Sequence, residues 1–393
     1  MAPATRLRLF YFLYYGGVGA YLPYFAPYLR GLGFSGEQIG AAQMVAPLVA
    51  APAALTWAAA ADRSGAPVRL LRLATIWAAL AASLLPLAGT PWPVAGVLLA
   101  WSMAGSAVVP LTDAVTLEWC RENPATSYAR IRLFGSLGFV ALSVAMGAAL
   151  TARGDRPGDL LVPASVAACV VGYALVARRL PAGAPRLERP GLREMSALLG
   201  DRSLLLLLLV CALHWGATAP YHLFFGVLVR DLGLPSEVTG LGMGVGVAAE
   251  VAALLAFPRL ERRLSLRALF AAAFAGSAVR WWLVSRLTGA AGLVAVQALH
   301  GLTFGLFWAT AMKAMSDQVP GRLRATGQAL FTAVVFGGGN AIGYGLSGVG
   351  YDRLGGAPRL FAGAALAELL PLALALLALG RPAARPGESG PRA

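Results

Sequence analysis

Ionisable side chains interrupt several long apolar stretches of this sequence. If such a stretch crosses a lipid bilayer, a charged side chain at its centre costs at least ~2.5–3.5 kcal/mol on insertion scales. Such residues therefore usually face a water-filled cavity, have a partner and take part in function. Carboxylates and imidazoles can exchange protons, and an arginine can attract an anion. The residues concerned are Asp113, His214, His222, Glu250, Arg280, His300 and Glu368.

Glu250 and Arg280 lie at matching depths in two neighbouring apolar stretches, residues 237–257 and 267–287. At about 1.5 Å per helical residue, each lies ~20 Å from the start of its stretch, counted from opposite sides. We therefore expect both side chains to face one cavity and to pair. In the functional interpretation, Arg280 attracts an anion or keeps Glu250 ionised, and Glu250 exchanges a proton. The alternative is an ion pair that only holds two helices together.

His300 lies about ten residues, or ~15 Å, into the stretch 290–315, which is near the middle of a bilayer. A neutral histidine hydrogen-bonded between helices is one interpretation, and a substrate or proton-relay contact is the other. Asp113 is a further candidate for proton exchange. It could instead form a structural pair with Arg132 of the following apolar stretch.

The stretch 203–229 carries His214 and His222 eight residues apart, on roughly the same face of a helix. Either histidine could therefore contact a substrate. Glu368 lies in the last apolar stretch, and we expect it to serve helix packing.

Aromatic side chains such as Tyr21 and Trp215 could form stacking walls around a ring. Other aromatic residues must lie at the membrane surface. An arginine combined with aromatic walls suits an aromatic or small carboxylate better than a bare sugar.

Membrane-spanning helices are the elements expected to position these side chains. The chain is 58% hydrophobic and only 13% charged, with a mean hydropathy of +0.68, whereas soluble domains carry about 25% charged residues. A helix needs about 20 mainly apolar residues to cross the bilayer core. The sequence offers twelve such windows, at residues 7–29, 37–61, 69–89, 92–117, 130–152, 159–178, 203–229, 237–257, 267–287, 290–315, 325–350 and 357–379.

The distribution of basic residues predicts the orientation. If the N-terminus is placed in the cytoplasm, most of the 32 Lys and Arg residues fall in the cytoplasmic loops. The positive-inside rule then predicts that both termini are cytoplasmic. It also accounts for the net charge of +14 without nucleic acid as a partner.

The chain repeats itself. A shift of 200 residues pairs Gly16 with Gly216, Tyr21 with Tyr221, Arg30 with Arg230 and Glu37 with Glu237. We therefore expect two parallel six-helix bundles, the arrangement of a transporter that rocks around a central site. The predicted parts are an N-terminal bundle (1–179), a cytoplasmic linker (180–200), a C-terminal bundle (201–380) and a cytoplasmic tail (381–393).

Short motifs show that the sequence resembles the major facilitator superfamily, and within it the branch of the phenylpropionic acid and lactose permeases. AADRSGAPVR at 60–69 is similar to the superfamily's loop signature, with Asp62, Arg63 and Gly65 in place. The resemblance implies that this loop latches the cytoplasmic side in one state. The branch is indicated by VVPLTDA at 108–114, YARIRLFGSLGF at 128–139, AAEV at 248–251, VRW at 279–281 and QALHG at 297–301.

The resemblance to lactose permease also implies roles for single residues. Glu250, Arg280 and His300 fall on residues used there in sugar binding or proton coupling, and Arg132 falls on an arginine that contacts the sugar. Phe139 stands where lactose permease stacks a tryptophan on the sugar, and the phenylpropionate branch also has phenylalanine there.

Two departures change the expected proton chemistry. Thr303 occupies the position of an acidic proton site, one turn after the histidine, and Leu117 that of a carboxylate in the fourth helix. If protons are coupled, the task then falls to Glu250, with His300 and Arg280 tuning it.

We therefore predict a secondary transporter of the bacterial cytoplasmic membrane, not an enzyme, that moves a small organic solute inward with a proton. Sodium coupling remains possible. The alternatives are a proton-antiport exporter and a non-transporting sensor. The sequence contains no nucleotide-binding motif, so we do not expect ATP hydrolysis to drive transport. The three cysteines do not have the spacing of metal ligands. We expect no metal or other cofactor and a monomer in the bilayer.

Overall fold

The protein is helical throughout the part that the computed structural model describes, residues 2–180, 198 and 200–379. Ten of its helices are long and apolar enough to cross a membrane, and Leu161–Ala177 is a shorter apolar helix. The predicted span 7–29 corresponds to a broken pair of helices. The predicted all-helical membrane fold is therefore confirmed. The predicted linker and tail lie mainly outside the described residues.

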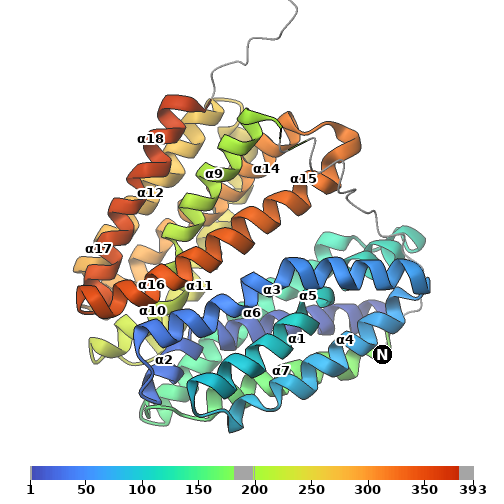
Figure 1. The fold of residues 1–393 in the computed structure, drawn as a ribbon, viewed down its shortest axis with the longest axis horizontal. Coiled ribbons are helices and arrows are strands. Elements are labelled where there is room, and N and C mark those ends of the chain that lie inside the picture. The colour runs from blue at the N-terminus through green and yellow to red at the C-terminus, as the bar shows by residue number, and fades with distance from the viewer. Residues whose placement is uncertain (1, 181–197, 199, 380–393) are drawn as a thin grey trace, which may run out of the picture.

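The N-terminal half forms the lower bundle in Figure 1. Its elements are α1 (Pro3–Tyr21), α2 (Phe25–Gly31), α3 (Gly36–Ser64), α4 (Pro67–Ala82), the short η1 (Leu85–Leu87), α5 (Pro91–Glu122), α6 (Tyr128–Ala152) and α7 (Leu161–Ala177).

The C-terminal half forms the upper bundle. Its elements are α9 (Arg202–Ala217), α10 (Ala219–Asp231), α11 (Glu237–Leu260), α12 (Leu266–Arg286), α13 (Ala290–Ala295), η2 (Val296–Leu299), η3 (Gly301–Leu306), α14 (Phe307–Gln318), η4 (Gly321–Leu323), α15 (Arg324–Phe331), η5 (Thr332–Gly339), α16 (Asn340–Leu354), α17 (Ala357–Ala367) and α18 (Leu369–Ala378).

Several membrane spans are interrupted, and the causes are local. Pro23 lies between α1 and α2, where its ring and missing N–H stop the first helix. Pro220 follows the break between α9 and α10 at Thr218. The elements η3 and η5 are wide π-helical turns, which occur frequently at functional sites. Because such turns change the phase of a helix, they decide which side chains face inward.

Glycines allow the two halves to meet closely between α3 and α16. A Cβ on Gly40 would lie 2.6 Å from the carbonyl oxygen of Tyr344, and a Cβ on Gly348 would lie 2.5 Å from that of Gly36. No real Cβ tolerates such distances, so only glycine permits this backbone contact.

Carboxylates complete the same junction by binding helix N-termini of the opposite half. Asp352, in the last turn of α16, accepts hydrogen bonds from the backbone N–H groups of Gly36 (2.9 Å) and Glu37 (2.8 Å) at the start of α3. In the repeat-related place, Asp155 accepts from the N–H of Ser236 at 3.3 Å, just before α11. A carboxylate at a helix N-terminus is favoured by the helix dipole.

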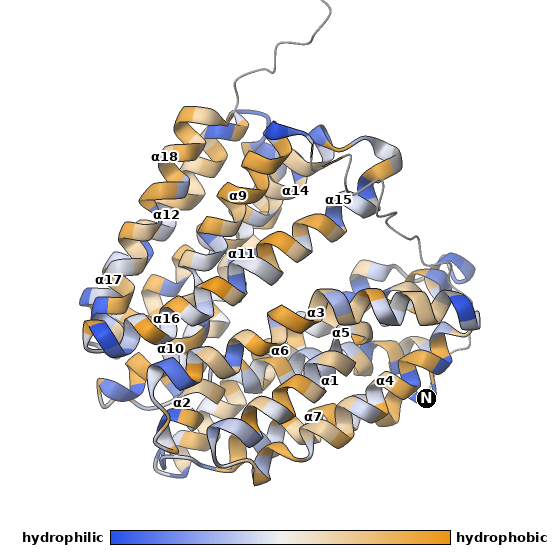
Figure 2. Cartoon of the chain, viewed as in Figure 1, coloured by the Kyte–Doolittle hydropathy of each residue, from blue (hydrophilic) through white to orange (hydrophobic). Residues whose placement is uncertain are grey.

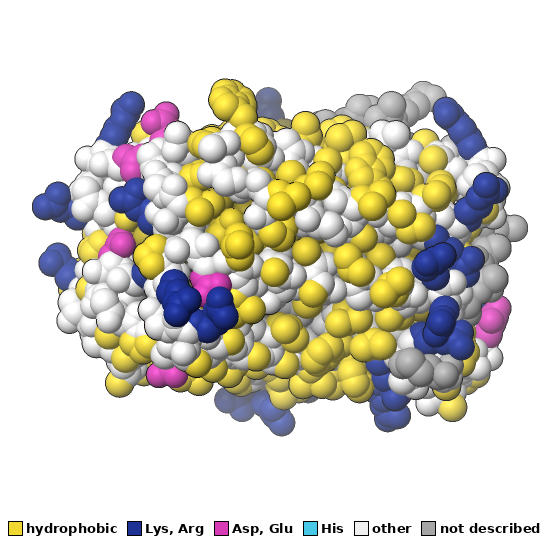
Figure 3. Space-filling view, turned by 90° about the horizontal axis from the view of Figure 1, so that it is seen from below, with side chains coloured by type: hydrophobic (Ala, Val, Ile, Leu, Met, Phe, Trp, Pro, Cys, Tyr) yellow, Lys and Arg dark blue, Asp and Glu magenta, His cyan; other side chains and the backbone are white. Residues whose placement is uncertain are grey.

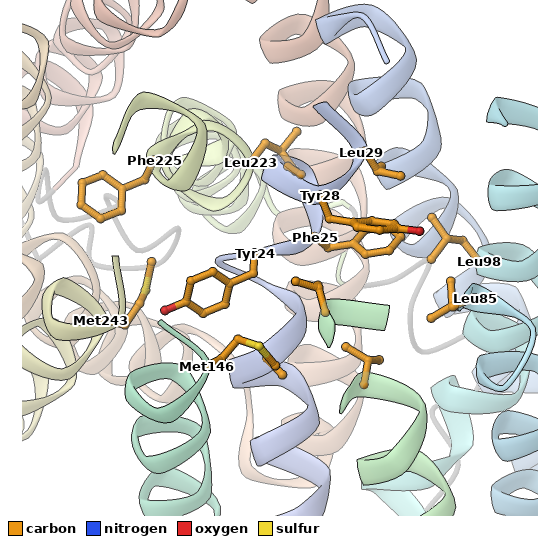
Figure 4. Close-up of a cluster of buried hydrophobic side chains, with 14 of the residues drawn as sticks. Tyr24, Phe25, Tyr28, Leu29, Leu85, Leu98, Met146, Leu223, Phe225 and Met243 are labelled. Atoms are coloured by element: carbon orange, nitrogen blue, oxygen red, sulfur yellow. The ribbon is translucent and has the colours of Figure 1, made fainter. Parts of the chain in front are cut away.

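A buried aromatic cluster lies beside these contacts. Figure 4 shows Tyr24 between Met146 of α6 and Met243 of α11, with Phe225 nearby. The Tyr24 hydroxyl donates to the carbonyl of Ser143 at 2.7 Å. We call this the closed end of the molecule. The halves diverge toward the opposite, open end, where α14, α15 and the N-terminus lie (Figure 1).

The outer surface matches a bilayer. Apolar residues dominate the helices along their length (Figure 2), and Figure 3 shows a broad hydrophobic band between groups of Lys and Arg at the two ends. Large side chains such as Leu87 (81% exposed) and Trp92 (87% exposed) are on the outside. This pattern is expected where lipid replaces water as the solvent.

Candidate functional site

A cavity of about 380 Å³ lies between the two halves. Its wall is aromatic and uncharged among the described residues, with hydroxyl and amide groups as its polar atoms. The polar and aromatic lining residues are Tyr14, Tyr21, Gln43, Trp101, Ser102, Ser106, Tyr173, Phe336, Asn340 and Tyr344. Such a wall suits a small solute that carries a ring.

Tyr21, predicted to contact substrate, lines this cavity. Its hydroxyl donates to the Oε1 of Gln43. Its ring stacks on Phe25 with centroids 4.6 Å apart, and it forms a T-shaped contact with Trp101, whose ring centroid is 5.2 Å away. The side chain is therefore held by packing and by a hydrogen bond.

Gln43 and Asn340 line the cavity but were not among the predicted site residues. The Oδ1 of Asn340 is buried without a hydrogen-bond partner, so it is available to a ligand donor. Both residues are uncharged, and a search for ionisable residues within apolar stretches passes over them. Both amides lie within predicted membrane spans, and this is the only sequence signal that marks them.

Arg280 is the centre of a second cluster, inside the C-terminal half. Its guanidinium donates to the Nδ1 of His300 at 2.9 Å and to the Oε1 of Gln297. The rings of Tyr221 and Trp281 lie 4.2 and 4.5 Å from it, which is a cation–π arrangement on two rings. Arg280 itself is completely buried, and it does not line the cavity.

His300 lies between the two groups that were expected to pair. Its Nε2 is 3.8 Å from the carboxylate of Glu250, and both side chains are partly exposed. The predicted direct Arg280–Glu250 pair does not form in the described structure, because the guanidinium is occupied by His300 and Gln297. Since arginine only donates, the Nδ1 of His300 is the acceptor, and its proton is on Nε2, facing Glu250.

Trp215 and His222 connect this cluster to the cavity. The indole of Trp215 lies 5.4 Å from the ring of His222, and His222 lies 5.9 Å from Tyr221 and 6.3 Å from Tyr344. Both Trp215 Nε1 and His222 Nδ1 are buried without a hydrogen-bond partner. Neither side chain is among the residues that line the cavity, so their substrate role stays a prediction. His214, by contrast, is buried inside the C-terminal half.

Asp113 and Arg132 lie in a tyrosine-rich cluster of the N-terminal half. Asp113 accepts a hydrogen bond from the hydroxyl of Tyr11, at 2.5 Å. Arg132 donates to the hydroxyl of Tyr15 and lies 4.0 Å from its ring. The structure thus places tyrosines around both residues. Phe139 lies about two turns further along α6 and is half-buried against the hydrophobic core.

The predicted latch residues lie at the open end. Asp62 and Arg63 are in the last turns of α3, and Gly65 caps this helix with a φ of +59°. A left-handed residue at this place is the usual use of glycine after a helix. Arg63 is exposed, and the latch role of this loop stays a prediction.

One ion pair outside the membrane spans fixes the loop between α6 and α7. Arg153 donates to Asp159 at 2.8 Å, and this hydrogen bond holds the pKa of Asp159 below its usual range. Asp159 also accepts from the N–H of Leu161 at 2.9 Å, at the start of α7.

A membrane-embedded pair of helical bundles, with an aromatic cavity between them that is shut at one end, defines a secondary transporter. The chain belongs to the MFS_1 like family, whose model matches residues 4–362. The predicted membership of the major facilitator superfamily is confirmed.

Similar proteins support this assignment. The chain is 30% identical over 366 residues to the probable 3-phenylpropionic acid transporter of Escherichia coli, covering 90% of this chain and 92% of that one. It is 32% identical over 349 residues to the maltose permease of Geobacillus stearothermophilus, covering 87% and 85%. These relatives are transporters rather than enzymes.

Solved structures show the same fold. The nucleoside transporter NupG superposes with a TM-score of 0.84 at 17% identity, covering 96% of this chain and 98% of that one. A bacterial homolog of the human lysosomal transporter Spinster superposes with a TM-score of 0.73 at 14% identity, covering 95% of both chains. The protein is thus a multi-pass membrane transporter with bacterial relatives.

Proposed function

We propose that the protein is a proton-coupled symporter that carries a small, ring-bearing organic solute into the bacterial cytoplasm by alternating access. The observation that carries this proposal is the contact of Glu250 with His300 at 3.8 Å, beside a buried arginine. It places a carboxylate that can gain and lose a proton next to groups whose charge is fixed.

The orientation follows from the loops. Those at the open end carry most of the basic residues of the chain. By the positive-inside rule this end faces the cytoplasm, together with both termini. The structure then represents an inward-facing state, with the Asp352 and Asp155 contacts closing the outer side. The Asp62–Gly65 loop would latch the cytoplasmic end in the opposite state.

Proton coupling is assigned to Glu250. His300 is held neutral because the Arg280 guanidinium donates to its Nδ1. Arg280 keeps its charge under all ordinary conditions. Glu250 is consequently the member of the cluster whose protonation can change its net charge. His300 and Arg280 tune this change, and Asp113 in the other half is a second candidate for proton binding.

The substrate class is assigned from the wall and from the buried cation. Aromatic side chains around the cavity can stack on a ring. Arg280 supplies a buried positive charge beside Tyr221, and attraction to an anion is strong across a poorly polar interior. An aromatic carboxylate is therefore the favoured substrate, and a sugar or a nucleoside is the alternative. The other proposed contacts are Arg132 and Phe139, and we propose that the monomer is the working unit.

Transport in proteoliposomes tests this function. Purified protein is assayed for counterflow with labelled phenylpropionate, maltose and a nucleoside, in vesicles without a proton gradient. We expect counterflow of one of them, and external alkalinisation when that solute is added. External acidification when the solute is added would favour a proton-antiport exporter, because an antiporter moves a proton out of the vesicle as the solute enters. Binding without counterflow would favour a sensor and contradict the proposal.

A further inference from the structure

A second pair of ionisable residues lies inside the C-terminal half, apart from the cavity. The Nδ1 of His214, on α9, is 2.9 Å from the Oε2 of Glu368, between α17 and α18. The Nε2 of His214 is 3.0 Å from the carbonyl oxygen of Thr303, and the indole N–H of Trp281 donates to the Oε1 of Glu368 at 3.3 Å. Both members of the pair are completely buried.

The partners of this pair fix how many protons it holds. A carbonyl only accepts, so the Nε2 of His214 carries a proton. An indole only donates, so the Oε1 of Glu368 accepts from Trp281, and the described structure shows no acceptor for a proton on that oxygen. One further proton must lie between Nδ1 and Oε2, on either atom. The pair is neutral overall in both cases, and losing or gaining a proton would leave a net charge in a buried place, which is costly.

The surroundings of the pair keep that proton in place. The rings of Phe274 and Phe307 lie 4.9 and 4.3 Å from the ring of His214. Of the other titratable groups on the packed elements, Cys211 precedes His214 by one turn of α9 and is buried. Arg280 is separated from the pair by Trp281, whose ring it contacts at 4.5 Å. Both of these side chains are fully buried.

The pair is joined to the transport site through Thr303. This residue lies in the π-helical turn η3, which begins directly after His300. The same turn packs on α11 at Glu250, because a Cβ on Gly305 would lie 3.0 Å from the Glu250 carbonyl oxygen. A hydrogen bond to the Thr303 carbonyl therefore helps to set where His300 stands relative to Glu250 and Arg280.

We propose that His214 and Glu368 form a second protonated site, which retains one proton throughout the transport cycle and positions the π-helical turn that follows His300. This inference rests on the proposed function. The pair consists of positioning residues: it binds a proton, whereas Glu250 exchanges one. Its loss displaces His300 from Arg280 and Glu250 and weakens substrate binding without removing a substrate contact.

Two substitutions of Glu368 separate retention from exchange. Glu368→Gln can donate to Nδ1 and accept from Trp281, so it copies the form in which the acid holds the proton. We expect its KM in counterflow to stay within about twofold of the wild type, with proton-driven accumulation preserved. Glu368→Leu removes both hydrogen bonds, and we expect KM to rise about tenfold with little change in maximal rate. Accumulation lost in Glu368→Gln, with counterflow intact, would show that the pair releases its proton and would overturn the proposal.

His214→Phe tests the hydrogen bond to Thr303 itself. We expect a KM increase like that of Glu368→Leu and an altered pH profile of binding, while a purely structural role would lower only the thermal stability. An unchanged KM and pH profile would contradict the proposed positioning. If this variant does not fold, the wild-type protein still provides the test. The chain has only three histidines, so protein labelled with ¹⁵N-histidine gives a simple NMR spectrum. The signals that disappear in His300→Gln identify His300 and so help to assign those of His214.

In that NMR experiment the shifts of the two ring nitrogens show which of them carries a proton, and we expect the Nε2 of His214 to be protonated because it donates to the Thr303 carbonyl. An Nε2 of His214 without a bound proton would contradict the pair as assigned. These results can be told apart from a failure of the proposed function. If the wild type shows counterflow without proton-driven accumulation, the proposed proton coupling is contradicted. The KM differences between the variants and the NMR result still test the role of the His214–Glu368 pair.

Discussion

His300 accepts a hydrogen bond at Nδ1 from the guanidinium of Arg280, 2.9 Å away, and turns its other nitrogen toward Glu250. The histidine thus lies between a permanent cation and a carboxylate. A neutral Glu250 leaves the cluster with one positive charge, and an ionised Glu250 cancels it. Proton binding and anion binding at this place are therefore linked through one neutral imidazole.

Removing the imidazole tests this link. In His300→Ala the guanidinium loses an acceptor in a buried place, which costs about 1–3 kcal/mol. We expect at least a tenfold rise in the KM of counterflow and weaker proton-driven accumulation. His300→Gln, which can offer an acceptor to Arg280, should lose less affinity. Unchanged transport in His300→Ala would exclude His300 as a substrate contact and as a relay.

Arg280 tests the substrate class. Arg280→Gln removes the buried charge, and Arg280→Lys keeps the charge but cannot reach His300 and Gln297 with a planar fork. If the solute is an aromatic carboxylate, Arg280→Gln should lower its counterflow far more than Arg280→Lys does. The measurement compares how strongly phenylpropionate and its uncharged amide each compete with the labelled solute in counterflow. Equal competition in the wild type would show that the solute is recognised as a neutral molecule.

Asp352 tests the outer closure. Its carboxylate binds the N-terminus of α3, and Asp352→Ala should cost the closed end about 1 kcal/mol, as for a helix cap. This corresponds to an about fivefold shift toward the outward-facing state. Spin labels at Arg156→Cys and Leu354→Cys, in a background without native cysteines, report the opening as a longer distance. Glu122→Ala, an exposed carboxylate at the open end, is the control and should leave the distance unchanged.

The sequence predicts the architecture well, because hydropathy and loop charges are properties that single residues carry. All twelve predicted spans correspond to helical segments of the described chain, and the span 290–315 is divided most, into α13, η2, η3 and α14. Glu250, Arg280 and His300 also lie at similar depths in one cluster, since depth along a helix follows from counting residues at 1.5 Å each. The expected shared cavity is not seen, because neither Glu250 nor Arg280 lines it.

The partners within the site are less predictable. The sequence indicates a Glu250–Arg280 pair, yet His300 and Gln297 take the guanidinium. Rotation about the helix axis decides this, and the π-helical turn η3 changes that rotation where no sequence rule marks it. Gln43 and Asn340 escape attention for another reason. They carry no charge, and their importance arises from the cavity, which the two halves form only after folding.

Asp159 provides a test of stability against pH. Because Arg153 lowers the pKa of Asp159 in the folded protein, the ion pair stabilises the fold above the unfolded pKa, near ~3.9. That contribution disappears as the pH falls through the lower, folded value. We expect Asp159→Asn to reduce the thermal stability at about pH 7 and to matter less at about pH 3. Thermal unfolding in detergent measures both, and an equal effect at the two pH values would argue against this pair.

Glu250→Gln is the most direct test of the account, measured as solute movement in proteoliposomes with and without an imposed proton gradient. Glutamine keeps the size and the polarity of the side chain but cannot exchange a proton. We predict that counterflow persists, while gradient-driven accumulation and external alkalinisation are lost. Accumulation against a gradient at the wild-type level in Glu250→Gln would contradict the assignment of proton coupling to Glu250.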